Sequence, residues 1–205
     1  MKLLYQSHSP YARKVLVMAH EIGLADTIDV IHHETSPTQR NDDVFAKNPL
    51  GKVPVLITDN GQCLFDSIVI CEYLDGLHKL VPLIPPGGSE RWRALKLQAV
   101  AQGLADAGIA IRWEMERRPS QLRYQAFADG QTTKLIASYD YLEQAVEFDG
   151  TVTIGFIALA TTLDWLAFRN LPDFRPSRPR LTKWFDTFCK RRSMLATPLS
   201  GDTHD

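Results

Sequence analysis

The sequence predicts an α/β N-terminal part followed by an all-α C-terminal part. In roughly the first 80 residues, short apolar runs typical of strands alternate with apolar spacing typical of helices. The segment His78–Glu90, HKLVPLIPPGGSE, then holds three prolines and two glycines, and so neither continues a helix nor pairs as a central strand. Beyond it the strand signals disappear and only helical spacing remains. We therefore expect two parts of different class joined by a linker.

The N-terminal part opens in the order strand, helix, strand. Leu3–Tyr5 is a short apolar run, and from Pro10 the apolar positions recur at helical spacing as far as Ile22. Gly23 suits the residue after the end of a helix. A second apolar stretch at Ile28–Ile31 predicts the next strand.

A hairpin and a further helix complete this part. The polar segment Glu34–Asp43 carries no interpretable signal. The strand-like run Val53–Ile57 then leads through Asp-Asn-Gly at 59–61 to a second run at 63–65, a pattern typical of a two-residue hairpin turn. A helix is expected to begin at about Ser67, so the order is βαβ-ββα.

The C-terminal part reads as a helical bundle. Helical spacing covers Arg91–Arg118, Ser120–Glu147, Ile154–Arg169 and Pro179–Arg192, with breaks at Pro119, Gly150 and Pro172. The tail from Ser193 is short and polar, and we expect it to be frayed. The expected division is a domain at 1–78, a linker at 79–90 and a helical domain at 91–205.

Composition excludes several classes of function. Lysine and arginine number 23 against 24 acidic residues, so the chain has no global charge that would attract nucleic acid or an anionic membrane. The N-terminus lacks the apolar core of a signal peptide, no run reaches membrane-spanning length, and a cytoplasmic location is the expectation. Cys63, Cys71 and Cys189 are scattered and predict buried thiols, not a disulfide framework. His32 and His33 are adjacent and have no further ligands nearby, so no metal site is expected.

The first motif is SPYARKV, which starts at Ser9. Proline suits the first position of a helix and the preceding serine suits the N-cap, so an ordinary capped helix explains both residues. A hydroxyl nevertheless has one donor as well as its acceptor sites. Ser9 is therefore able to cap the helix and still donate outward to an anion.

The second motif is NPLGKVPVL, from Asn48 to Leu56. A proline between strand-like residues is typical of an edge position or a cis peptide bond. A cis Pro54 would turn the backbone of Val53 outward, where it could pair with an extended peptide. An ordinary loop entering a strand is the alternative, and both interpretations stay open on these residues alone.

The third motif is FDSIVI, in which Asp66 or Ser67 caps a helix. The free amides and the dipole of that helix would accept a carboxylate, and Asp66 beside them could hold an ammonium group. The pair thus suits the amino-acid end of a zwitterionic ligand. A simple helix start explains the same residues equally well.

In this order and with these separations, the three motifs resemble the glutathione-binding half of the glutathione transferase superfamily, in particular its bacterial-like, serine-type cytosolic members. The match covers residues 1 to about 77. It implies a thioredoxin-like fold for 1–78, glutathione as cosubstrate without a prosthetic group, a homodimer and a role in detoxification. The implied glutathione contacts are Ser9 at the sulfur, Val53 before a cis Pro54 at the cysteinyl backbone, Lys52 near the glycyl carboxylate, and Asp66 and Ser67 at the γ-glutamyl ammonium and carboxylate.

The resemblance also implies the chemistry. Ser9 would stabilise the glutathione thiolate and not act as a covalent nucleophile, since no histidine and acid at triad spacing accompany it. A small hydrophobic electrophile would bind against the long helix from Arg91, with candidate contacts Tyr11, Arg112 and Trp113, which are alternatively core, interface or solvated residues. The basic loop ligand of such relatives is left unassigned, because Gln39 and Arg40 do not align well. Glutathione-dependent reduction, isomerisation or peroxidase activity, or a non-catalytic binding or regulatory role, stay open as alternatives.

Overall fold

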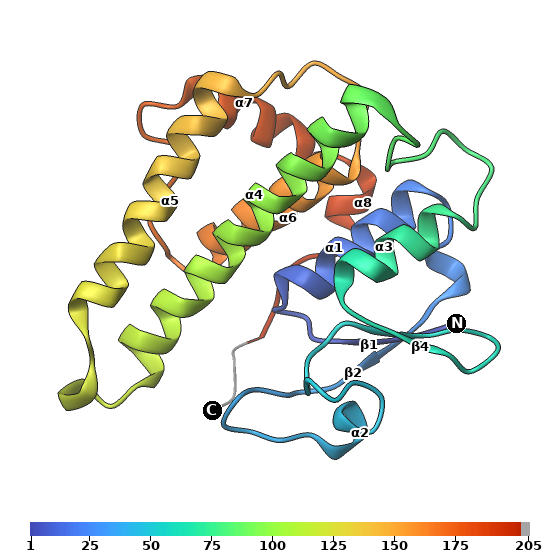
Figure 1. The fold of residues 1–205 in the computed structure, drawn as a ribbon, viewed down its shortest axis with the longest axis horizontal. Helices are drawn as coiled ribbons and strands as arrows, with labels where there is room; N and C mark the ends of the chain where they lie inside the picture. The colour runs from blue at the N-terminus through green and yellow to red at the C-terminus, as the bar shows by residue number, and fades with distance from the viewer. Residues whose placement is uncertain (202–205) are drawn as a thin grey trace. The chain divides into compact units, whose positions relative to one another are not determined.

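The computed structural model describes residues 1–201, and Figure 1 shows their arrangement as a ribbon. The chain forms two compact units. The first comprises Met1–Trp92 together with the segment from Arg191 onward, and the second comprises Arg93–Lys190. The sequence-based division had placed the segment from Arg191 with the helices. Residues 202–205 of the expected tail lie outside the described residues.

The first unit is built on a mixed four-stranded sheet. Its strands are β1 (Lys2–Tyr5), β2 (Asp29–His32), β3 (Val55–Ile57) and β4 (Cys63–Leu64), in the spatial order β2-β1-β3-β4. β1 pairs parallel with β2 and antiparallel with β3, and β3 pairs antiparallel with β4. The central strand β1 is buried from Leu3 to Tyr5, as its continuous apolar run requires. The predicted hairpin is confirmed, although its loop spans residues 58–62 and not two residues.

Two helices of this unit pack side by side (Figure 1). They are α1 (Pro10–Glu21) and α3 (Ser67–Asp75), each close to its predicted start. The segment that gave no sequence signal contains the short helix α2 (Asp42–Phe45), capped by Asn41. A 3-10 turn, Ala25–Thr27, links α1 to β2.

The C-terminal tail is ordered as far as the structure describes it, and the expectation that it frays from Ser193 is wrong for residues 193–201. It contains the helix α8 (Arg192–Leu195), which packs against α1. Ser193, Met194 and Thr197 are buried. The reason is tertiary: the polar side chains of Arg13 and Glu21 in α1 form hydrogen bonds with this segment, which a local sequence pattern does not reveal.

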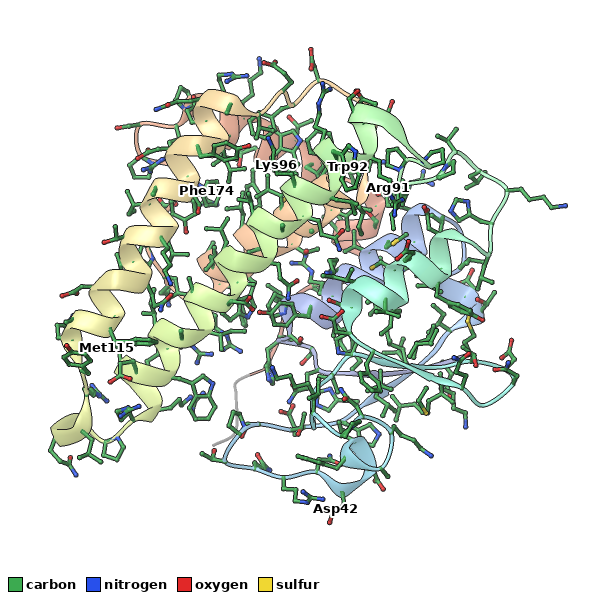
Figure 2. All side chains as sticks on the ribbon, in the orientation of Figure 1. Asp42, Arg91, Trp92, Lys96, Met115 and Phe174 are labelled. Carbon is green, nitrogen blue, oxygen red and sulfur yellow. The ribbon has the colours of Figure 1, made fainter. Side chains whose placement is uncertain are left out.

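The second unit is all-helical. It contains the part of α4 (Gly88–Arg112) from residue 93 on, α5 (Gln125–Ala145), α6 (Ile154–Phe168) and α7 (Pro179–Phe188). α6 is buried along nearly its whole length, so it forms the centre of this unit. Phe174, labelled in Figure 2, packs edge-on against Tyr139 of α5 and Phe185 of α7. The predicted fold class, a thioredoxin-like N-terminal part and a helical C-terminal part, is confirmed.

The helix predicted at 91–118 ends as an α-helix at Arg112. It continues as a π-helical turn over Trp113–Arg117, and a 3-10 turn follows at Ser120–Leu122. The buried carboxylate of Glu114 accepts a hydrogen bond from the Tyr124 amide, at 2.5 Å, and forms an ion pair with Arg118, at 3.1 Å. The bond to Tyr124, the N-cap of α5, joins the π-helical turn to the start of that helix. Within the described residues, no helix is both long enough and apolar enough to cross a membrane.

Candidate active site

Three segments singled out in the sequence meet at one edge of the sheet. Leu4 of β1 lies opposite Val55, the first residue of the antiparallel strand β3. The chain leaving β1 and the chain entering β3 are therefore at the same edge. β4 runs antiparallel to β3 and ends at Leu64, so its exit reaches this edge too. The topology thus collects the segments that carry Ser9, Val53 and Asp66.

Ser9 is the N-cap of α1. Its Oγ accepts a hydrogen bond from the Ala12 amide at 3.2 Å, and Pro10 occupies the first helical turn. Ser9 is buried, and its own amide donates to the Gln6 carbonyl at 3.0 Å, which closes a tight turn after β1. No described group accepts the hydroxyl proton of Ser9. The side chain therefore caps the helix and retains a free donor, the combination expected from its sequence.

The segment before β3 has one of the two backbone forms that the motif left open, the one that the family resemblance implied. The Val53–Pro54 peptide bond is cis. Val53 itself lies outside the β1–β3 ladder, which reaches only to Val55. The turn before it is held by Asn48, whose side chain donates to the Lys52 carbonyl at 2.8 Å and accepts from the Leu50 amide at 3.0 Å. The Lys52 side chain is exposed.

Asp66, and not Ser67, caps α3. Its Oδ1 accepts from the Ile68 amide at 3.0 Å, and the residue is exposed to solvent. Ser67 occupies the first helical position and is only 1% exposed. Its Oγ has no hydrogen-bond partner among the described residues. A buried hydroxyl at the positive end of a helix is a donor suited to a carboxylate.

The structure adds supporting residues that the sequence did not reveal. The Gln6 side chain donates to Glu34 Oε2 and to the Thr35 carbonyl, both at 3.0 Å. The Thr35 hydroxyl donates to the Gly51 carbonyl at 2.9 Å. These bonds tie the turn before Ser9 to the segment before β3. Glu34 and Thr35 belong to the polar stretch without pattern, and only the turn-forming Asn48 had a recognisable signal.

The candidates for the second substrate fall in different units. Tyr11 is partly exposed in the first turn of α1. Arg112 ends α4 and donates from Nε to Glu116 at 3.0 Å, and Trp113 begins the π-helical turn. Tyr11 belongs to the first unit, whereas Arg112 and Trp113 belong to the second.

The cysteines are all free thiols. Cys71 is fully buried, and this burial raises the pKa of its thiol to about 12, so it is inert at neutral pH. Cys63 and Cys189 are partly exposed, so burial is right for Cys71 only. The carboxylate Oε1 of Glu34 accepts a hydrogen bond from His32 Nε2 at 2.6 Å. Among the described residues, no group of three or more metal-ligating side chains is placed to hold an ion.

The fold and this sheet edge define a class of protein: a thioredoxin-like unit that carries a helix-capping serine, a cis-proline segment and a second capped helix, joined to a helical unit. Comparison with known proteins agrees. The model of the glutathione S-transferase N-terminal domain matches residues 8–77. The uncharacterized GST-like protein YibF of Escherichia coli K12 is 34% identical over 203 residues, covering 96% of this chain and 98% of its own. The chain belongs to the glutathione transferase superfamily.

Solved structures of relatives extend this result. A glutathione transferase family member from Pseudomonas fluorescens Pf-5 with bound glutathione superposes with a TM-score of 0.94 at 38% identity, over 98% of this chain and 99% of that one. A second structure from the same organism holds S-(propanoic acid)-glutathione and gives a TM-score of 0.90 at 38% identity, over 98% and 100% of the two chains.

Proposed function

We propose that the protein is a glutathione transferase in which Ser9 stabilises the glutathione thiolate for attack on small hydrophobic electrophiles. The observation that carries the proposal is the Ser9 hydroxyl, which accepts from Ala12 at the start of α1 and keeps its proton free for a further acceptor. A related protein with bound glutathione, 38% identical over nearly the whole chain, supports this assignment.

The energetics are sufficient for the task. A free thiol with a pKa near 8.5 is only a few per cent ionised at neutral pH, and the thiolate is the nucleophile. Lowering the thiol pKa by about two units requires about 2.7 kcal/mol. A hydrogen bond from Ser9 to the thiolate supplies about 1.5 to 3 kcal/mol. The N-terminus of α1 supplies about 0.3 to 2 kcal/mol more.

The remaining glutathione contacts follow the same sheet edge. We propose that the backbone of Val53, ahead of the cis Pro54, pairs with the cysteinyl unit by strand-like hydrogen bonds. Lys52 is proposed for the glycyl carboxylate. Ser67, whose buried hydroxyl has no described partner, receives the γ-glutamyl carboxylate. Asp66 has one carboxylate oxygen bonded to the Ile68 amide and offers the other to the γ-glutamyl ammonium.

Conjugation proceeds by attack of the bound thiolate on an electrophilic carbon. With an aryl halide, a sulfur–carbon bond forms, the carbon–halogen bond breaks, and halide leaves with the bonding electron pair. Tyr11, Arg112 and Trp113 are proposed to contact the electrophile. A relative from Pseudomonas fluorescens that binds S-(propanoic acid)-glutathione, a thioether of glutathione, supports conjugation as the reaction.

Two measurements test the function. The protein is first applied to immobilised glutathione and eluted with free glutathione, and the purified protein is then assayed for conjugation of a model aryl halide. Retention together with turnover supports a transferase. Binding without turnover of the halide, but with reduction of a disulfide or peroxide, assigns one of the other glutathione-dependent activities. Binding without any turnover favours a non-catalytic role, and absence of binding contradicts the proposal.

We further propose that the protein forms a homodimer, lies in the cytoplasm and acts in detoxification. The proposed linker spans residues 79–90, and the proposed helical domain begins at residue 91. Large apolar side chains exposed on the first unit support self-association, and Trp92, labelled in Figure 2, is 69% exposed. Val69, Leu77, Leu80 and Val81 are further examples. Light scattering coupled to size-exclusion chromatography tests the mass, and Trp92→Arg is expected to shift a dimer towards monomer.

A further inference from the structure

The C-terminal segment follows α1 backwards, from its last turn to the residues before its first. At the end of α1, Glu21 accepts hydrogen bonds from Arg191 and Ser193. Near the beginning of α1, Arg13 donates to the Thr197 carbonyl at 2.6 Å and to the Met194 carbonyl at 3.4 Å. The segment is thus anchored at two places on one helix, in antiparallel direction.

A third anchor lies on the turn that precedes α1. The Ser7 hydroxyl donates to the Ser200 carbonyl at 2.8 Å, and the Ser200 amide donates to the Ser7 carbonyl at 3.3 Å. The same two residues therefore exchange two hydrogen bonds. The last described stretch of the chain is bound directly to the loop between β1 and Ser9.

Gly201 shows how closely the segment approaches this loop. Its φ is +80°, a conformation that side chains other than glycine rarely adopt. A Cβ at this position would lie 3.3 Å from Ser7 Oγ and 3.8 Å from His8 Nδ1. His8 is buried and directly precedes Ser9. The backbone of Gly201 is therefore part of the packing around the residues that lead to Ser9.

The turn from Gln6 to Ser9 fixes where the Ser9 hydroxyl lies. Within it, the Ser9 amide bonds to the Gln6 carbonyl at 3.0 Å, and Ser7 and His8 form the two residues between. A displacement of Ser7 is passed to Ser9 through this short closed turn. Since catalytic hydrogen bonds are sensitive to displacements of about 1 Å, the support of this turn bears on reactivity.

We propose that the segment Thr197–Gly201 acts as a positioning strap for the active site, with Ser7 and Gly201 as positioning residues that hold the Ser9 hydroxyl in line with the glutathione sulfur. This inference rests on the proposed role of Ser9. It assigns the strap a task separate from stability. The buried Arg13 and the Glu21 ion pair carry the attachment to α1, whereas the Ser7–Ser200 bonds are exposed and contribute little to folding.

The test removes the strap contacts one at a time. Ser7→Ala deletes the donor to Ser200, and Gly201→Ala places a methyl group against Ser7 in a strained backbone conformation. Thr27→Ala is the matched control, because Thr27 also donates an exposed hydroxyl to a backbone carbonyl, that of Leu24 at 2.7 Å, but at the far end of α1. The readouts are the pKa of the bound glutathione thiol, from its thiolate absorbance, kcat, the KM for glutathione, and the melting temperature.

Ser7→Ala is expected to raise the bound thiol pKa by about 0.5 to 1 unit and to lower kcat at neutral pH about 1.5- to 3-fold, with KM and melting temperature near wild type. Gly201→Ala should do the same or more, and Thr27→Ala should change neither thiol pKa nor kcat. If both strap variants keep the wild-type thiol pKa, the strap role is wrong while the function of Ser9 stands. If the wild-type protein does not lower the thiol pKa, the proposed function fails first, and this inference with it.

Discussion

Glu21, in the last turn of α1, accepts two hydrogen bonds from the guanidinium group of Arg191, at 2.8 Å from Nε and 2.7 Å from Nη2. Ser193 adds a third, at 2.5 Å. Burial by itself raises the pKa of Glu21, but the bonds from Arg191 and Ser193 outweigh it and hold the pKa below its usual value. The carboxylate is thus the main ionic link between α1 and the C-terminal segment.

Replacing Glu21 by Gln is therefore expected to lower the free energy of unfolding at pH 7 by about 1 to 2 kcal/mol. Because the folded-state pKa is depressed, the contribution is complete above the unfolded-state value of about 4.3 and is lost as pH falls through the folded-state pKa. Wild type and variant should converge only once the pH is below the depressed folded-state pKa. Urea unfolding over a pH series measures this gap.

Glu72→Gln is the control for this prediction. Glu72 is 64% exposed and makes a single 3.4 Å contact with Arg91 in the same unit, so its loss should change stability little. A gap between wild type and Glu21→Gln that persists unchanged in acid would show that the charge of Glu21 is not what stabilises the segment.

Ser9 has two roles that substitution should separate. Ser9→Ala loses the N-cap, at about 1 kcal/mol of stability, and also the hydroxyl donor. Ser9→Gly loses only a few tenths of a kcal/mol of capping but lacks the same donor. Both variants should raise the pKa of the bound glutathione thiol by about 1 to 2 units and lower kcat at neutral pH about 3- to 25-fold. Recovery of thiol ionisation in Ser9→Gly would assign the effect to helix capping alone.

Replacing Ser67 by Ala is expected to have opposite effects on stability and on glutathione binding. Its buried hydroxyl has no described partner, so Ser67→Ala removes an unsatisfied group and should leave the melting temperature unchanged or raise it. If the hydroxyl receives the γ-glutamyl carboxylate, the Kd for glutathione rises about 10- to 100-fold, equivalent to about 1.4 to 2.8 kcal/mol. Calorimetric titration measures the Kd. An unchanged Kd would remove Ser67 from the glutathione site.

The sequence predicted those parts of the site that local chemistry determines. A serine before a proline caps α1, and an aspartate–serine pair starts α3. The Val53–Pro54 bond is cis, one of two forms that the residues alone left open and the one that the family resemblance implied. Each depends on the conformational preferences of one or two adjacent residues. The strand and helix order followed from apolar periodicity in the same way. Which of Asp66 and Ser67 caps α3 stayed open, because both side chains suit that position.

The rest of the first unit depends on contacts between residues distant in the chain. From the sequence alone, Arg13 and Glu21 resemble charged side chains on the solvent-exposed face of a helix. The structure instead buries Arg13 against Thr197 and pairs Glu21 with Arg191. The polar tail was predicted to fray for the same reason, since its partners lie far away in sequence. The Gln6–Glu34–Thr35 bonds likewise have no periodicity to reveal them.

Two glycines of α4 offer a paired test of packing in the helical unit. A Cβ at Gly108 would lie 2.6 Å from Leu166, 2.8 Å from Trp165 and 2.9 Å from Leu171, whereas a Cβ at Gly103 would meet no atom within 4 Å. Gly108→Ala is expected to cost about 1 to 3 kcal/mol through overpacking. Gly103→Ala on the same helix should instead stabilise by about 0.5 to 1 kcal/mol, because alanine favours helix over glycine. Thermal and urea unfolding measure both. Equal effects of the two substitutions would contradict the close approach of α4 and α6 at Gly108, since propensity alone predicts the same gain at each position.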